Sequence, residues 1–159
     1  MIKQTAKYAS LFSIGGVLYY FIEIICRGFS HWTMILVGGI CFILIGLINE
    51  TILTRNMPLI EQMLISCMMI TGVEFIAGVI LNRILNLNIW DYSDRPFNIL
   101  GQICLKNSIY WFWLSLVGIV LDDYIRYLFF HGRKPNYRLF ITWLEWELCQ
   151  NKSIMKVEL

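Results

Sequence analysis

Four long apolar stretches dominate this sequence of 159 residues and restrict the folds open to it. A helix needs about 20 largely apolar residues to cross about 30 Å of hydrocarbon. Four segments meet this requirement, at about residues 8–26, 31–53, 59–82 and 101–130. The pattern therefore predicts an all-α integral membrane protein, built as a bundle of four transmembrane helices.

The composition also favours a membrane protein. Hydrophobic residues make up 58% of the chain and charged residues only 15%, whereas a soluble domain carries about 25% charged residues. The chain has too few charges to cover a soluble core and too many apolar residues to be disordered. Its net charge of +2, without a basic stripe, argues against a nucleic-acid partner. The five cysteines are widely spaced and form no CxxC pair, so we expect no disulfide framework, metal site or cofactor.

The connections between the predicted spans differ in character. The first two are short, which favours antiparallel neighbours. The third, at residues 83–100, contains an aromatic and polar motif from Trp90 to Pro96. It is too polar to span and too aromatic to be a plain linker, so it predicts an outer interfacial or re-entrant loop.

The last part of the chain has a different pattern from the spans. Leu139, Trp143 and Trp146 recur at helical spacing after a basic elbow, which predicts a short amphipathic helix on the membrane surface. We therefore expect a membrane domain over residues 1–132 and a tail over residues 133–159.

The distribution of basic residues predicts the orientation. With four spans both termini lie on one side, and that side holds nine of the thirteen Lys and Arg residues. Basic residues collect on the cytoplasmic side of membrane proteins. We therefore expect a multi-pass membrane protein with both termini in the cytoplasm and the loop at residues 83–100 outside.

Polar residues gather in the outer half of this predicted bundle. An ionisable group in hydrocarbon is costly, so it needs a partner, water or a place near the interface. The first and third spans end outside, and the second and fourth begin there. This topology brings together the candidate substrate-binding residues Glu23, Arg27, His31, Glu74, Asn82, Trp90, Asp91, Tyr92, Arg95, Gln102 and Lys106.

Two interpretations of this outer group are open. In the first, it forms an outward-facing polar pocket that binds a polar or charged solute, an ion or a headgroup. In the second, pairs such as Glu23–Arg27 and Glu74–Lys106 only hold the bundle together. A stable bundle does not need this many buried charges, which favours a binding site. Glu74 is the deepest carboxylate of the group and must be paired, protonated or hydrated.

Three further features have a structural interpretation. The run from Tyr110 to Trp113 is typical of a lipid-facing or interfacial aromatic belt. The glycine pairs at residues 15–16 and 38–39 favour close packing of the first two spans, with a dimer face as the alternative. The inner span ends carry polar residues that we expect to be solvated: Asn49, Glu50, Glu61, Asp122, Asp123 and Arg126.

Several motifs also resemble those of one known family. They are the segments at residues 27–34, 38–42, 46–50, 71–75, 90–93 and 96–105. Together they extend over most of the chain, from about residue 11 to residue 127, and the set resembles the CmpB-like family of small bacterial membrane proteins, described as type IV ABC-transporter permeases. The resemblance implies a bacterial plasma-membrane protein of transport type, and it carries over no catalytic or substrate-binding residues.

Three functions are then open. The first is a transporter or permease subunit, acting as a homodimer or with another membrane protein. Its ATPase would be a separate chain, because this one has no GxxxxGK[ST] loop. The second is an accessory protein that recognises a lipid headgroup or a membrane partner. The third, and least favoured, is an intramembrane enzyme acting on lipid through Glu74, His31 or Asp91, since no HExxH or GxSxG motif is present.

Overall fold

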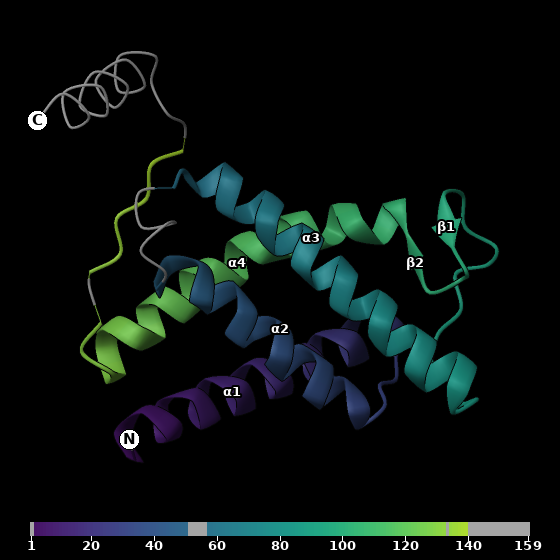
Figure 1. Ribbon diagram of the computed structural model, residues 1–159, viewed down its shortest axis with the longest axis horizontal. Helices are drawn as coiled ribbons and strands as arrows, with labels where there is room; N and C mark the ends of the chain where they lie inside the picture. Colours follow the sequence, from purple (N-terminus) through teal and green to yellow (C-terminus); the bar gives the residue numbers. More distant parts are fainter. Residues whose placement is uncertain (1, 51–56, 133, 140–159) are drawn as a thin grey trace, which may run out of the picture.

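The computed structural model describes residues 2–50, 57–132 and 134–139 of the chain (Figure 1). This part contains four α-helices: α1 (Ile2–Arg27), α2 (Thr33–Glu50), α3 (Leu59–Gly78) and α4 (Leu105–Phe129). A π-helix, η1 (Val79–Ile84), continues α3, and two short antiparallel strands, β1 (Asn98–Ile99) and β2 (Ile103–Cys104), precede α4. The prediction of a mostly helical protein with membrane-length helices is confirmed.

Among the described residues, three helical segments are long and apolar enough to cross a membrane: Gln4–Arg27, Leu59–Ile84 and Leu105–Phe129. Helix α2 is shorter. At about 1.5 Å per residue its 18 residues extend over about 27 Å, slightly less than the hydrocarbon thickness. A fourth span at α2 therefore stays a prediction. The predicted surface helix of the tail lies outside the described residues.

The fourth helix begins later than predicted. We expected a span from residue 101, but α4 starts at Leu105. Leu100 and Gly101 have φ angles of +53° and +68°, which an α-helix does not allow. Gly101 is required at this turn, because a Cβ atom there would lie 2.6 Å from Asp91 Oδ1. The residues before α4 thus form a tight hairpin against the loop rather than the first turn of a span.

The helices form two antiparallel pairs that meet at α2. Helix α1 packs along α2, α3 packs against α4, and α2 also contacts both α3 and α4. Glycines permit the closest of these contacts. A Cβ atom on Gly16 would lie 2.8 Å from the Ile35 side chain, and one on Gly39 would lie 2.7 Å from the Phe12 carbonyl oxygen. The interpretation of the glycine pairs as packing sites within the chain is confirmed.

Several connecting segments lie together at one end of the bundle. Figure 1 shows the α1–α2 connection, the end of η1 and the β1–β2 hairpin at the end opposite the N-terminus. Here Arg27 closes α1, and Gly28, with a φ angle of +81°, ends the helix by donating its N–H to the Ile24 carbonyl at 2.8 Å. We call this region, residues 27–33 and 84–105, the loop end.

The opposite end contains a buried ionic network, so the prediction that these groups are solvated is wrong for two of them. Asp122 is fully buried and Arg126 is 5% exposed. The Arg126 guanidinium lies 2.5 Å from both Asp122 Oδ2 and Glu50 Oε1, and Lys7 and Tyr8 also bind the Glu50 carboxylate. We call these five residues the inner network.

Gly46 on α2 explains how these charges enter the bundle. A Cβ atom at this position would overlap the side chains of both Asp122 and Arg126. The prediction for Asp122 and Arg126 used only their distance from the end of the span. That distance does not reveal the space that Gly46 leaves for them on α2. Glu61, by contrast, is exposed as predicted.

Candidate functional site

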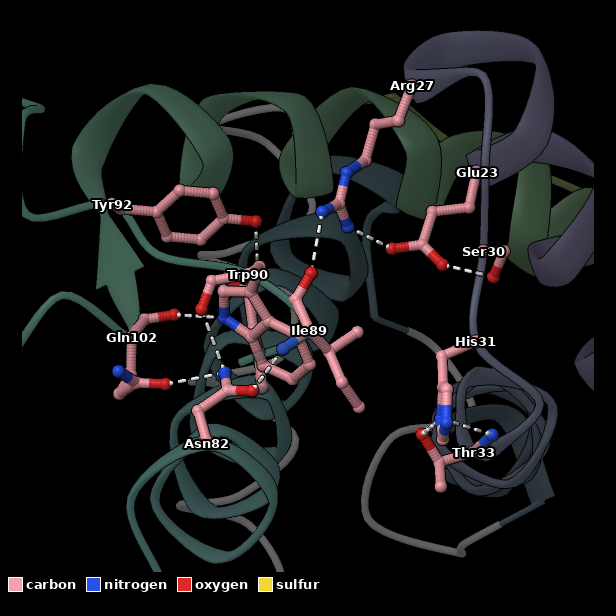
Figure 2. Close-up of polar contacts among 11 residues, drawn as sticks. Glu23, Arg27, Ser30, His31, Thr33, Asn82, Ile89, Trp90, Tyr92 and Gln102 are labelled. Carbon is pink, nitrogen blue, oxygen red and sulfur yellow. Dashed lines mark hydrogen bonds and ion pairs between the residues drawn. The ribbon is translucent and has the colours of Figure 1, made fainter. Parts of the chain in front are cut away.

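Asn82 ties the outer loop to the bundle. Its Nδ2 donates to the Trp90 carbonyl oxygen and to Gln102 Oε1, each at 2.9 Å, and its Oδ1 accepts from the Ile89 N–H at 2.7 Å. The Trp90 indole N–H donates to the Gln102 carbonyl oxygen at 3.0 Å (Figure 2). Both amide donors of Asn82 are thus used on its neighbours, and the π-helical turn η1 holds this residue in place.

The hairpin docks on α3 at Gly78. A Cβ atom on this glycine would lie 2.6 Å from Gln102 Oε1. Gly78 thus permits the close approach of a neighbour, which is the Gln102 side chain.

A second tie joins α1 to the same loop. Arg27 Nη1 lies 2.5 Å from Glu23 Oε1, and Arg27 Nη2 donates to the Ile89 carbonyl oxygen at 3.0 Å. The Ser30 hydroxyl also donates to Glu23 (Figure 2). The predicted Glu23–Arg27 pair is confirmed, and it holds the segment that leads into Trp90.

Glu74 lies on α3 and is only 6% exposed. Its Oε2 accepts a hydrogen bond from the Trp111 indole N–H at 2.7 Å, and its Oε1 accepts one from the Tyr92 hydroxyl at 3.3 Å. The predicted partner Lys106 is exposed, and its ammonium lies 5.8 Å from the centre of the Tyr110 ring. Within the described residues, the hydrogen-bond donors to Glu74 are therefore neutral groups rather than a cation.

A cavity of about 100 Å³ borders the Glu74 side chain. All four α-helices and the loop contribute to its lining, which is almost entirely apolar and aromatic. Tyr19 of α1 and Trp111 of α4 meet beside it, with their ring centres 5.8 Å apart, and Trp90 of the loop also lines it. Glu74 is the one carboxylate that the described residues place in this lining. No group of His, Cys, Asp and Glu in the described part of the chain is arranged to hold a metal ion.

The structure divides the predicted site residues into four sets. Glu74 and Trp90 line the cavity, and Tyr92 reaches Glu74. His31 binds the Thr33 hydroxyl at 2.8 Å, where α2 begins (Figure 2). The residues that hold the loop are Glu23, Arg27, Asn82 and Gln102. The residues that are exposed, away from the cavity lining, are Asp91, Arg95 and Lys106.

Two residues at the cavity, Tyr19 and Trp111, were not among the predicted site residues. The interpretation of the aromatic run as a lipid-facing belt is wrong for Trp111, although Tyr110 and Trp113 are exposed. The sequence did contain a signal for this orientation, because Trp111 shares a helix face with polar residues spaced seven apart, Ser108, Ser115 and Asp122.

Two titratable groups in the loop have shifted pKa values. The Ser93 hydroxyl and N–H donate to Asp91 Oδ1 at 2.6 and 2.9 Å, and these hydrogen bonds lower the pKa of the Asp91 carboxyl. Burial, followed by the negative charge of Glu74, raises the pKa of the Tyr92 hydroxyl. Tyr92 therefore keeps its proton and acts as a hydrogen-bond donor.

The family described as "Putative ABC-transporter type IV" matches residues 10–144. The chain belongs to this family. Its membership in the type IV family, together with three membrane-length helices, makes it a membrane protein of transporter type. The matched region includes every residue that lines the cavity, from Gly15 to Leu121. Neither a curated protein nor a solved structure matches the chain.

Proposed function

We propose that this protein is the permease subunit of a bacterial plasma-membrane transporter, and that Glu74 holds the polar or charged end of its substrate. One observation carries the proposal: a buried carboxylate with neutral hydrogen-bond donors borders a cavity lined by all four α-helices. An ionisable group at such a depth is costly, and it marks a functional site more often than a structural one. A largely apolar cavity with few polar groups is also the usual form of a ligand site.

The outer loop acts as the cover of this site. With both termini in the cytoplasm and α2 as a fourth span, the loop end faces the outside. Trp90 lies over the cavity, and the loop is held by Asn82, Gln102 and Arg27. Release of these few contacts would open the cavity toward the outer surface. Residues 1–132 form the membrane domain in this arrangement, and residues 133–159 form a cytoplasmic tail.

The subunit works with other chains. It has no GxxxxGK[ST] loop, so a separate ATPase supplies the energy. Four helices are few for a complete pathway, and a second copy or another membrane protein completes it.

The apolar lining favours one second candidate, an accessory protein that recognises a membrane lipid. In this case an acyl chain occupies the cavity and the headgroup lies at Glu74. A lipid-modifying enzyme gains no comparable support, because His31 binds Thr33 and Asp91 binds Ser93, so neither joins Glu74.

The test compares the wild type with Glu74→Gln, using Glu61→Gln on the exposed part of the same helix as the matched control. Each full-length chain is expressed in a strain that lacks its gene and is purified from that membrane in a mild detergent. We expect an ATPase to copurify in fixed stoichiometry with all three. The deletion strain should be defective in uptake. The wild type and Glu61→Gln should restore uptake, but Glu74→Gln should not.

Two results would contradict the permease proposal. If no ATPase copurifies, and a lipid is retained by the wild type but lost from Glu74→Gln, the accessory function replaces it. If Glu74→Gln restores uptake fully, Glu74 holds no substrate.

A further inference from the structure

We infer that the ligand of this cavity is a cationic amphiphile, such as an alkylammonium compound, and that it enters from the bilayer between α1 and α4. The inference rests on the proposed function, since it takes Glu74 as the group that receives the ligand. It adds the chemical class of the ligand and its route.

Charge determines the class of the polar end. The donors to Glu74 in the described residues are neutral groups, on the side chains of Trp111, Tyr92 and Asn107. The Arg27 guanidinium at the loop end is already engaged by Glu23 and the Ile89 carbonyl oxygen. An anionic group would meet an unbalanced carboxylate at low dielectric, whereas a cation would balance it.

Aromatic rings favour the same class of ligand. Tyr19, Trp90 and Trp111 come from α1, the loop and α4, and all three line the cavity that Glu74 borders. Cations are attracted to the faces of such rings, and indole rings bind them best. A carboxylate beside two indoles and a phenol is therefore suited to an alkylammonium group more than to a hydrated metal ion, which would need several oxygen ligands.

The remaining lining accounts for the apolar part of the ligand and for its route. Leu18 of α1 and Val117 of α4 line the cavity, yet they are 40% and 57% exposed on the surface of the chain. Both lie on membrane-length helices, so this exposed face is in contact with lipid. Helix α1 packs chiefly on α2, and these exposed lining residues lie on α1 and α4, which makes the α1–α4 seam the opening. The loop covers the cavity at its outer end, so the open side faces hydrocarbon.

Cys41 provides a readout inside the cavity, because its side chain is part of the lining. The full-length chain, with the other cysteines replaced by Ala, is placed in lipid nanodiscs and reacted with a membrane-permeant maleimide. Decyltrimethylammonium is the test probe. The comparison probes have the same chain length: decyl sulfate as the anion, decanol as a neutral donor, and the uncharged compound with a quaternary carbon in place of the nitrogen.

We expect the cation to slow the reaction of Cys41 by about tenfold, the effect of one charge-assisted contact. Each of the three comparison probes, at the same membrane concentration, should slow the reaction by less than about twofold. Glu74→Gln should lose the protection by the cation, and Glu61→Gln should keep it. Far-ultraviolet circular dichroism and size-exclusion profiles show whether each variant is folded.

The outcomes distinguish failure of the cationic assignment from failure of the proposed function. If decanol protects Cys41 as well as the cation does and the protection needs Glu74, the cationic assignment is overturned and the proposed function stands. If no probe protects Cys41 in folded protein, the inference is overturned, and copurification with an ATPase decides the proposed function on its own.

The route is tested by filling its mouth. Val117→Trp should prevent protection of Cys41 by the cation. Ile109→Trp is the matched control, because Ile109 is also exposed on α4 but does not line the cavity. Equal rates of protection in Val117→Trp and the wild type would overturn entry between α1 and α4.

Discussion

The Glu74 and Asp122 carboxylates are both buried in this bundle, and their surroundings differ. Asp122, in the inner network, pairs with Arg126 and packs against Gly46 without a gap. Glu74, toward the loop end, accepts hydrogen bonds from neutral groups and borders a cavity. Leu121, the residue before Asp122, lines the same cavity, but Asp122 itself does not.

The difference suggests separate roles for the two regions. In the inner network two cations, Lys7 and Arg126, balance two carboxylates, Glu50 and Asp122, and the contacts join α1, α2 and α4. A balanced and closely packed group of charges holds helices together. An unbalanced carboxylate beside a space adds little to helix contact and is available to a ligand.

The largest effect on stability is expected at Arg126. Arg126→Met keeps much of the side-chain volume but leaves Asp122 buried without its cation, which costs about 3–5 kcal/mol of unfolding free energy. Denaturant titration in mixed micelles measures the change. Lys7→Met is the matched control at the edge of the same network, where about 1 kcal/mol or less is expected. Equal losses in the two variants would show that burial of the pair has no special importance.

A smaller loss is expected at Gly46. Gly46→Ala places a methyl group where the Asp122 and Arg126 side chains lie, and such overpacking costs about 1–3 kcal/mol. Gly72→Ala on α3 is the control, because a Cβ atom there meets nothing within 4 Å. It should be neutral or stabilising by up to about 1 kcal/mol, since alanine favours helix over glycine. If Gly46→Ala is as neutral as Gly72→Ala, the inner network is not closely packed at Gly46, and its contrast with the cavity at Glu74 is lost.

The contacts of Asn82 should have a local effect. Asn82→Ala leaves the buried Ile89 N–H without its acceptor and releases the Trp90 carbonyl oxygen, at a cost of about 1–2 kcal/mol. We expect faster amide hydrogen exchange in residues 85–100 with little change in α1 and α2. Arg83→Ala, exposed on the same π-helix, should leave exchange unchanged. Uniform loss of protection throughout the bundle would contradict a role confined to the loop.

The smallest effect on stability is expected at Glu74. In Glu74→Gln the amide oxygen still accepts one hydrogen bond, and removal of the unbalanced charge offsets the loss of the other. The unfolding free energy should therefore change by less than about 1 kcal/mol. Asp122→Asn, measured under the same conditions, should cost clearly more. If Glu74→Gln is as destabilising as Asp122→Asn, then both carboxylates are structural.

The helices could be predicted from the sequence because lipid requires long apolar runs. The polar positions at the loop end could also be predicted, since topology alone brings them to one side. Which of them face the cavity could not. Gln102 turns toward Asn82 because of a hairpin with positive φ angles at Leu100 and Gly101, and composition does not encode such a turn.

The partners of the buried charges were the least predictable part. Spacing along α4 suggested Lys106 for Glu74, but Trp111 supplies the hydrogen bond, because the helix presents Trp111 rather than Lys106 to α3. The burial of Asp122 depends on a missing side chain at Gly46 on another helix. Both results depend on which faces of distant helices meet, and one sequence does not specify those faces.

The most direct test of the central claim, that the cavity beside Glu74 receives a ligand, is an experimental structure of the full chain in nanodiscs of its native lipids, with an antibody fragment bound for particle alignment. The account predicts elongated non-protein density between α1 and α4, with its polar end within hydrogen-bonding distance of the Glu74 carboxylate and its apolar part against Leu18 and Val117. A cavity closed by the Tyr19 and Trp111 side chains, with no density beside Glu74, would contradict it.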